Sequence, residues 1–402
     1  MARNVVVTGM GVATPIGVDV ASYWDGLSNG RSGITRREYT ADDLALTVAS
    51  APIDGLDEKL KALGAGTARA DRVSQLAVYA AEEAVASSGI EFENEDLLRG
   101  ACIIGTGIGG QATFDNSYVG MLRRGRRPHP LTILRVIPNA PVSHVSIKYK
   151  LRGPAFAVSS ACASGAHAIG TCADIIKSGA ADYGLAGASE AILCYGALDA
   201  WRSMHIMADE TCRPFSKNRN GLVIGEGAGV FVLEEEEHAK KRGANILARI
   251  AGFGMNADGN DMINPAVEGA SGAMQLALQN VEINDLSAVY INAHGTGTLM
   301  NDPTETKAIR DVFGAGADEL IVSSTKSMHG HLLGAAGGIE TAAAILALNN
   351  NVAPPTVNLD EPDPECDLNY APNEAMTRKF DLALSNSFAF GGLNAVIALE
   401  AV

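Results

Sequence analysis

The chain has 402 residues, of which 47% are hydrophobic and 19% charged, and its formal net charge is −15. This length exceeds the usual size of one hydrophobic core, so we expect two closely packed domains or one large duplicated core. The negative charge argues against a nucleic-acid partner, because no excess of positive charge offsets the phosphates. No apolar run reaches the length of about 18 residues that a membrane-spanning helix needs, so membrane insertion is not expected.

Short apolar runs alternate along the chain with alanine-rich segments of helical period. The predicted strands are Asn4–Thr8, Ala101–Thr106, Ala155–Ser159, Tyr183–Ala188, Gly229–Glu234, Leu247–Met255, Ala288–Ala293, Leu320–Ser324, Leu382–Asn386 and Ala395–Glu400. The predicted helices are Gln75–Ser88, Cys162–Ser178, Glu235–Arg242, Ser271–Asn280, Pro303–Val312 and Gly338–Asn349. This alternation predicts an α/β architecture with helices covering a sheet. The N-terminus is superficially like a signal peptide, but Gly9, Gly11 and Pro15 interrupt its apolar run, so we expect a buried first strand instead.

The segment from Glu234 to Gly243 marks the best seam between two parts of the chain. It predicts a solvated helix with acidic residues at its start, basic residues at its end and Gly243 as its terminator. No flexible linker marks a boundary nearby. We therefore expect two intimately packed halves, residues 1–245 and 246–402.

The cysteine pattern bears on cellular location and on metals. The chain has neither a CxxC pair nor disulfide-like or zinc-like spacing among its six cysteines, which are Cys102, Cys162, Cys172, Cys194, Cys212 and Cys366. In a chain of this length, that pattern indicates reduced thiols in a cytoplasmic protein. The glycine-rich segment 105–110 is a weak dinucleotide fingerprint, and no P-loop sequence occurs, so we expect no nucleotide cofactor.

Cys162 has a setting that suits a nucleophile. Residues 157–165 form a short apolar run that leads into a predicted helix, with the thiol at the junction. In the first turn of a helix, unpaired N–H groups and the helix dipole would lower the pKa of the thiol and make a thiolate available. A buried cysteine in an alanine-rich core helix is the alternative, and for a lone cysteine it is the commoner one.

Three further motifs each follow a predicted strand. Residues 290–298 place His294 before a Gly/Thr loop, residues 323–331 contain Lys326 with two histidines, and residues 386–392 end in a Phe-Gly-Gly sequence. Open α/β sheets collect their ligands at the carboxyl ends of strands. Two histidines, a lysine and a cysteine at such positions favour a catalytic site over separate structural roles.

Together these motifs resemble a β-ketoacyl-acyl carrier protein synthase of the elongating, type II kind, within the thiolase superfamily. The resemblance covers essentially the whole chain, and its segments are Val5–Gly11, Ser160–Gly165, Gly225–Gly229, Ala293–Thr298, Lys326 with Gly330–Gly337, and Asn386–Gly392. It implies an α/β, thiolase-like duplicated α-β-α-β-α layered fold. The Cys-His-His set differs from the Cys-His-Asn set of relatives that start chains, and the intact Cys162 differs from chain-length-factor subunits.

The resemblance also implies an activity and its catalytic residues. Cys162 would take an acyl group from an acyl carrier protein, and malonyl-carrier protein would then lose CO2 and attack the acyl-cysteine. His294 and His331 would donate hydrogen bonds to the enolate oxygen as neutral imidazoles, and backbone N–H groups of Cys162 and Phe390 would form a second oxyanion hole. Phe390 would also act as a mobile gate beside Gly391 and Gly392.

Other roles have plain structural alternatives. Lys326 would position the histidines, or simply form a buried ion pair with Glu340 or Glu305. Asp302 and Glu305 would support the active-site base, with a monovalent cation near Glu305 in some relatives. Helix capping by Asp302 before Pro303 could explain the same residues. His329 could compete with His331, but the frame Gly330–Gly337 favours His331.

Substrate and carrier contacts follow from the resemblance too. Ile108 and Leu198 would line an acyl tunnel, although core packing is equally probable for each. The other predicted substrate contacts are Thr296, Thr298, Phe388 and Gly391. The predicted docking residues for an acidic carrier are Arg69, Arg202, Arg124 and Arg127, of which the last two belong to the cluster Arg123–Arg127. A solvated loop is the alternative for that cluster.

The expected assembly is a homodimer without a cofactor, since phosphopantetheine arrives on the carrier protein. The Arg123–Arg127 cluster suggests a specialised synthase, for example of the nodulation or very-long-chain type. Two other functions remain open. A degradative thiolase usually has a second reactive cysteine near the C-terminus, and none follows Cys366. A non-catalytic partner subunit is disfavoured by the complete catalytic set.

Overall fold

The computed structural model describes residues 3–64 and 66–402. Its strands are β1 Val5–Ala13, β2 Thr35–Ala41, β3 Leu44–Ala51, β4 Gly100–Gly105, β5 Ala155–Val158, β6 Tyr183–Glu190, β7 Ile224–Gly225, β8 Gly227–Glu235, β9 Ala248–Ala257, β10 Val289–Asn292, β11 Ile321–Ser323, β12 Val352–Ala353, β13 Met376–Thr377, β14 Leu382–Ala389 and β15 Leu393–Glu400. Its α-helices are α1 Val20–Ser28, α2 Asp57–Lys61, α3 Arg72–Ser88, α4 Gln111–Arg124, α5 Thr132–Val136, α6 Ala140–Tyr149, α7 Ser164–Lys177, α8 Tyr195–Ser203, α9 Glu236–Lys241, α10 Val267–Leu278, α11 Asn301–Phe313, α12 Lys326–His329 and α13 Ala336–Asn350.

The large sheet consists of two five-stranded parts with the same internal pattern. Its strand order is β11-β10-β14-β15-β9-β1-β8-β6-β4-β5. In one part β5, β4 and β6 run parallel, while β8 is antiparallel to β6 and β1 to β8. In the other, β11, β10 and β14 run parallel, while β15 is antiparallel to β14 and β9 to β15. The two parts meet where β1 pairs with β9 through only two residue pairs.

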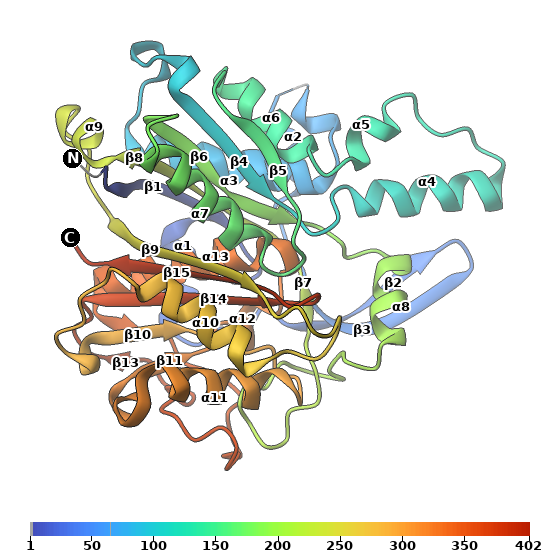
Figure 1. Ribbon diagram of the computed structural model, residues 1–402. Coiled ribbons are helices and arrows are strands. Elements are labelled where there is room, and N and C mark those ends of the chain that lie inside the picture. The colour runs from blue at the N-terminus through green and yellow to red at the C-terminus, as the bar shows by residue number, and fades with distance from the viewer. Residues whose placement is uncertain (1–2, 65) are drawn as a thin grey trace.

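Helices cover both outer faces and fill the middle, which makes five layers (Figure 1). Helix α3 packs on β1 and β8, and α10 packs on β9 and β15. Helices α7 and α13 contact one another and lie between the two parts of the sheet. From Ala336 to Leu348 every residue of α13 is buried, as a helix enclosed on all sides requires. The architecture is the thiolase-like α-β-α-β-α arrangement.

The same packing device appears in both halves. A Cβ atom on Gly11 would lie 2.1 Å from the carbonyl oxygen of Ala80 in α3, and one on Gly254 would lie 2.1 Å from that of Ala273 in α10. Such distances leave no room for a side chain, so each strand needs glycine where its outer helix crosses closely. Each half therefore pairs a glycine-bearing strand with an alanine-bearing helix, a repeat that the sequence patterns had not suggested.

Each predicted strand and helix has a counterpart, with shifted bounds. The first strand extends to Ala13, beyond the predicted end at Thr8, because Gly9 and Gly11 continue the pairing with β8. Helix α3 begins at Arg72, since Asp71 caps it by accepting a hydrogen bond from the backbone N–H of Val73. The domain boundary at residue 245 stays a prediction. Within the described residues, no helix is both long and apolar enough to span a bilayer.

Candidate active site

Cys162 lies on a sharp turn between β5 and α7. The preceding residue, Ala161, has a φ of +47°, a left-handed conformation that strains a residue with a Cβ atom. Ser164 stabilises the turn, because its hydroxyl donates to the carbonyl of Ala161 at 2.7 Å and accepts from the N–H of Ser160 at 2.9 Å. Helix α7 begins only at Ser164, so the prediction that it begins at Cys162 is wrong by one half turn.

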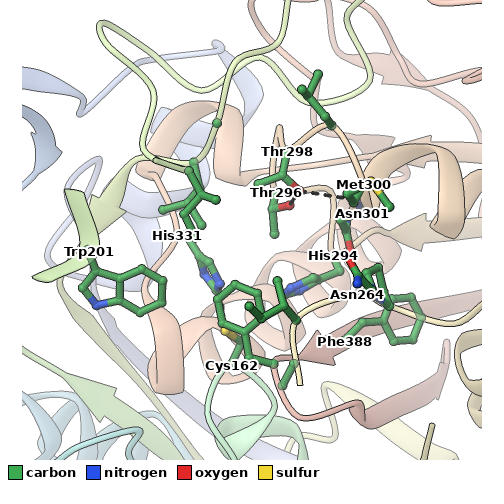
Figure 2. Close-up of a pocket in the computed structure, with 18 of the residues that line it drawn as sticks. Cys162, Trp201, Asn264, His294, Thr296, Thr298, Met300, Asn301, His331 and Phe388 are labelled. Carbon is green, nitrogen blue, oxygen red and sulfur yellow. Dashed lines mark hydrogen bonds between the residues drawn. The ribbon is translucent and has the colours of Figure 1, made fainter. Parts of the chain in front are cut away.

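Two histidines from the second half of the chain face this cysteine. His331 lies where its backbone N–H donates to the carbonyl of Val223 at 2.6 Å, and its Nε2 is 3.0 Å from the Sγ of Cys162. His294 follows β10, and its ring meets that of His331 edge-on with centroids 5.3 Å apart. One ligand atom from each of the three residues lies within 4.8 Å of the others. Figure 2 shows the two rings and the sulfur pointing into one cavity.

The hydrogen bonds on the far side of each ring define its tautomer. The backbone N–H of Leu333 donates to Nδ1 of His331 at 3.2 Å, and Nζ of Lys326 lies 3.3 Å from Nδ1 of His294. A neutral imidazole whose Nδ1 accepts a hydrogen bond carries its proton on Nε2. Both histidines therefore present an Nε2–H donor to the cavity. A metal ion on these nitrogens would need the opposite tautomer, which the two donors disfavour.

The ionisation of these groups follows from their burial. Burial, reinforced by the positive charge of Lys326, holds the pKa of His294 and of His331 well below the usual value, so both rings are neutral at pH 7. Burial also raises the pKa of the Cys162 thiol to about 12, against the opposing effects of Lys326 and of a backbone hydrogen bond from Phe390. The expected lowering of this pKa by the helix terminus is therefore wrong, because desolvation outweighs the nearby positive groups.

Lys326 contacts two neighbouring side chains, those of Glu340 and His294. Its ammonium group, which is fully buried, forms an ion pair with Glu340 and contacts His294. Burial raises the pKa of Glu340 to about 7, and Lys326 opposes that rise. The ion pair that we considered as an alternative role is present, and it coexists with the contact that orients His294.

Glu305 and Asp302 hold loops rather than cap a helix. The carboxylate of Glu305 accepts from the N–H groups of His294 and Gly295, each at 2.8 Å, and from the amide of Asn386 at 3.1 Å. Asp302 accepts from the backbone N–H of Phe215 at 2.7 Å. Helix α11 begins before it, at Asn301, whose backbone N–H donates to the hydroxyl of Thr298 at 3.4 Å. The capping alternative for Asp302 is wrong, because the carboxylate is turned to a neighbouring loop.

A monovalent cation, which the family resemblance implies near Glu305, would need oxygen ligands that are not already hydrogen-bonded. Both Glu305 oxygens are already hydrogen-bonded, whereas several buried oxygens have no partner. Among the described residues these include Asn292 Oδ1, Ser385 Oγ, Asn386 Oδ1, Ser387 Oγ and Glu340 Oε2, and the amide nitrogen of Asn386 is 3.1 Å from Glu305. These oxygens lie on β10, β14 and α13, which pack together. Carboxylate, amide and hydroxyl oxygens suit a hard cation, so these residues would hold such an ion and it would supply charge balance beside Lys326.

A cavity of about 260 Å³ leads to the sulfur. Thr296, Thr298, Phe388 and Phe390 line it with the Cys-His-His set, and the Thr296 and Thr298 hydroxyls are 2.9 Å apart. Gly391 and Gly392 have φ values of +83° and +66°, which only glycine adopts without strain. Gly392 lines the cavity and Gly391 does not.

Two predicted tunnel residues do not line this cavity, and their place along an acyl tunnel stays a prediction. Leu198 is completely buried in the core that also includes Cys162, and it does not line the cavity. Ile108 is 43% exposed and lies outside the cavity as well. His329 is buried with its Nδ1 2.8 Å from the carbonyl oxygen of Gly330. His331 is thus the histidine that reaches Cys162.

The four predicted docking arginines are exposed and do not line the cavity. Arg124 pairs with Asp42 at 2.9 Å and Arg202 with Asp199 at 2.6 Å. Arg69 ends a short 3₁₀ helix, and Arg127 follows α4. Exposed pairs of this kind contribute little stability, so these side chains remain free to exchange partners.

Two residues near the site, Glu190 and Trp201, were not predicted from the sequence. Glu190 is completely buried and accepts from the N–H groups of Gly107 and Gly334 at 2.6 and 3.0 Å, which links the turn after β4 to the segment that follows His331. Burial raises its pKa to about 7. Trp201 lines the cavity beside Phe390. The sequence offered one signal for each residue. Glu190 follows an apolar predicted strand, and Trp201 is one of only two tryptophans in the chain.

Comparison with known proteins fits this geometry. Residues 2–239 match the model for the N-terminal domain of β-ketoacyl synthases, and residues 247–360 match that for the C-terminal domain. The chain is 43% identical to a nodulation protein E of a Rhizobium species, with 100% of both chains covered. It is 42% identical to 3-oxoacyl-[acyl-carrier-protein] synthase 2 of Coxiella burnetii, with 100% and 99% covered.

Solved structures agree with the sequence relatives. A β-ketoacyl synthase from Burkholderia phymatum superimposes with a TM-score of 0.88 at 34% identity, and both chains are covered completely. A type II polyketide ketosynthase, solved with its acyl-carrier protein, gives 0.90 at 32% identity, again over both whole chains. With two matching domains, full-length relatives and a cysteine facing two histidines, the chain belongs to the β-ketoacyl synthase family.

Proposed function

We propose that the protein condenses an acyl group with malonyl-acyl carrier protein and releases 3-oxoacyl-acyl carrier protein, two carbons longer, and CO2. The observation that carries this proposal is the convergence of the Cys162 sulfur and two Nε2–H donors, those of His294 and His331, in one cavity. A nucleophile beside two neutral donors suits thioester chemistry in which an oxyanion forms.

In the first step, Cys162 receives the acyl group. Its sulfur forms a bond to the thioester carbonyl carbon, the bond to the carrier's thiol breaks, and the proton of Cys162 ends on the departing thiol. Because burial holds the pKa of Cys162 near 12, the thiolate needs local stabilisation as it forms. The Nε2–H of His331, 3.0 Å away, and the buried ammonium of Lys326 supply it.

In the second step, malonyl-carrier protein supplies the carbon nucleophile. The bond to its carboxylate breaks, CO2 leaves, and the electron pair passes into an enolate on the thioester. The two Nε2–H groups would donate hydrogen bonds to that enolate oxygen. The carbanion then attacks the acyl carbonyl, and the Cys162 sulfur leaves as a thiolate, which takes up a proton from solvent.

The test uses purified protein, malonyl-carrier protein and a series of acyl-carrier proteins, with Cys162→Ala as the control. We expect 3-oxoacyl products two carbons longer than the acyl donor, and none from the control. Acylated Cys162 without condensation would contradict the second step. A protein that cannot be acylated at Cys162 by any donor would overturn the nucleophile assignment.

The same series of acyl-carrier proteins tests which length of acyl chain the protein prefers. A nodulation protein E and a 3-oxoacyl-[acyl-carrier-protein] synthase 2 are nearly equally similar to this chain, at 43% and 42% identity. Both primary fatty-acid synthesis and a specialised lipid or polyketide pathway therefore agree with the comparisons. The preferred acyl donor distinguishes them.

Partners and location follow from the same activity. Phosphopantetheine would arrive on the carrier protein, and the chain itself would need no organic cofactor. The surface for the acidic carrier would include Arg69, Arg124, Arg127 and Arg202, whose charges would speed association more than they tighten binding. We place the protein in the cytoplasm, which suits its six free thiols.

We further propose a homodimer. Strand β5 ends the large sheet, and Phe156 on it is 42% exposed. Helices α4 and α5 extend from the body of the fold (Figure 1), and they carry further exposed apolar side chains, among them Phe114, Leu122 and Ile133. An unpaired edge strand beside exposed apolar residues is a typical setting for association of two copies.

A further inference from the structure

Trp201 stacks against Phe390 at the wall of the cavity. The two ring centroids are 6.0 Å apart and the ring planes are inclined by 23°. Both side chains line the cavity that reaches Cys162, and Figure 2 shows Trp201 beside His331 and the sulfur. Trp201 belongs to α8, whereas Phe390 follows β14, so the contact joins segments far apart in the chain.

The peptide of Phe390 acts on the nucleophile. The backbone N–H of Phe390 favours the ionised form of Cys162 and so lowers the pKa of the thiol, in opposition to burial. The glycine side of this turn is bonded to distant backbone groups, since Gly391 donates to the carbonyl of Met262 and Asp258 donates to that of Gly392, each at 2.8 Å. Gly392 also donates to the carbonyl of Ala389 at 3.0 Å, on the other side of Phe390. The aromatic ring of Phe390 has its stacking partner in Trp201.

We propose that Trp201 is a positioning residue that holds Phe390 at the wall of the cavity beside Cys162. The inference rests on the proposed function and adds a residue to it. Tryptophan suits the task because its large ring stacks with little loss of conformational freedom. The effect belongs to the acylation step, in which negative charge develops at Cys162 and at the carbonyl that it attacks.

The kinetic test compares Trp201→Ala, Trp201→Phe and the control Trp24→Phe, which alters the second tryptophan in α1. Loss of a stacking contact corresponds to about a three- to tenfold slower acylation of Cys162 in W201A. Phenylalanine should restore most of that rate, and W24F should match the wild type. Malonyl decarboxylation, which depends on the histidines, should change less than twofold. An equal loss in both steps, or no loss in W201A, would overturn the proposal.

A spectroscopic test needs no activity. In the W24F background Trp201 is the sole tryptophan, so its emission reports its surroundings directly. Adding Phe390→Leu should shift or brighten that emission, because the stacking ring is gone. Identical spectra with and without Phe390 would show that the stack is absent in solution. This result is independent of whether any carrier substrate is accepted.

Discussion

Nε2 of His331 lies 3.0 Å from Sγ of Cys162, although 169 positions separate the two residues in the chain. The contact joins the turn after β5 to a segment bridged to β7, so it exists only when both halves of the molecule are folded together. The Leu333 N–H donates to the other ring nitrogen and thereby directs a proton toward the sulfur. The catalytic geometry therefore depends on backbone groups that no residue pattern displays.

Removing His294 should impair decarboxylation more than acylation, whereas removing His331, which also contacts the sulfur at 3.0 Å, should slow both steps. His294→Ala or His331→Ala deletes one donor to the enolate oxygen, and loss of such a donor typically costs about 10²–10³ in rate. Release of CO2 from malonyl-carrier protein measures this step, and alkylation of Cys162 checks that the thiol stays accessible. His144→Ala, a half-buried histidine outside the cavity, is the control. Undiminished CO2 release by H294A and H331A would refute the donor assignment.

Substitution of Lys326 should affect folding as well as catalysis. Lys326→Met leaves the buried carboxylate of Glu340 without its partner, and breaking such a pair costs about 3–5 kcal/mol. Chemical denaturation measures the loss in the free energy of unfolding. The double variant K326M/E340Q should recover most of the stability, because no buried charge is left unpaired, yet its activity should stay low. Recovery of full activity by the double variant would show that the lysine serves only as an ion-pair partner.

The reactivity of Cys162 in the free enzyme should rise steeply with pH. A pKa near 12 means that the thiolate fraction is small at pH 7 and grows about tenfold per pH unit below that value. Rates of iodoacetamide alkylation between pH 6 and 10, corrected with Cys162→Ala, measure this. We expect K326M to react more slowly than wild type at each pH, because the positive charge that favours the thiolate is gone. A plateau near pH 7 would instead indicate a thiol with a lowered pKa.

The motifs predicted which residues meet, but not how they are held. Strands and helices whose apolar residues recur with a clear period lie where they were expected, because that pattern indicates directly which residues are buried. Helix α4 was missed because none of its residues is buried, so it shows no apolar face toward a core. The hairpin of β2 and β3 was missed for a related reason, as β2 has no buried residue. The hairpin is held instead by the antiparallel pairing of its own two strands, from Thr35 opposite Ser50 to Ala41 opposite Leu44.

Electrostatic details could not follow from residue type. The position of Cys162 next to a helix suggested a lowered pKa, but complete burial of the site reverses the direction. In the same way, Asp302 has the sequence context of a helix cap, yet its carboxylate accepts a hydrogen bond from the N–H of Phe215, 87 residues away. Both errors have one cause, because local sequence does not report the depth of a group in the fold.

His238, outside the active site, should make stability depend on pH. It lies between Glu234 at 2.7 Å and Glu95 at 2.9 Å, Arg242 pairs with the same Glu234, and the ring of Tyr183 stacks on the imidazole. Hydrogen bonding to Glu234, opposed by burial, raises the pKa of His238 to about 9. Because the folded value exceeds the unfolded one, this stabilisation is complete below about pH 6.5 and is lost as the pH rises through 9.

The expected loss across that interval is on the order of 2–3 kcal/mol. His238→Gln should flatten the dependence of the unfolding free energy on pH between 6.5 and 9, whereas His129→Gln, at an exposed position, should leave it unchanged. Urea denaturation at several pH values gives the slopes. Equal slopes for wild type and H238Q would mean that other groups dominate this pH range.

A charge on strand β5 should separate the two copies of a homodimer. Phe156 is exposed on a strand that pairs only with β4 among the described strands. If β5 and the exposed apolar side chains of α4 and α5 form the interface, Phe156→Glu would bury two like charges near the two-fold axis, at a cost that should weaken association at least about tenfold. Leu276→Glu, at a similarly exposed leucine of α10 on the outer layer, should remain dimeric. Light scattering over a dilution series gives the masses. A wild-type monomer would contradict the homodimer. An F156E dimer as stable as wild type would place the interface elsewhere, because a symmetric contact through β5 would lose affinity when it buries two carboxylates.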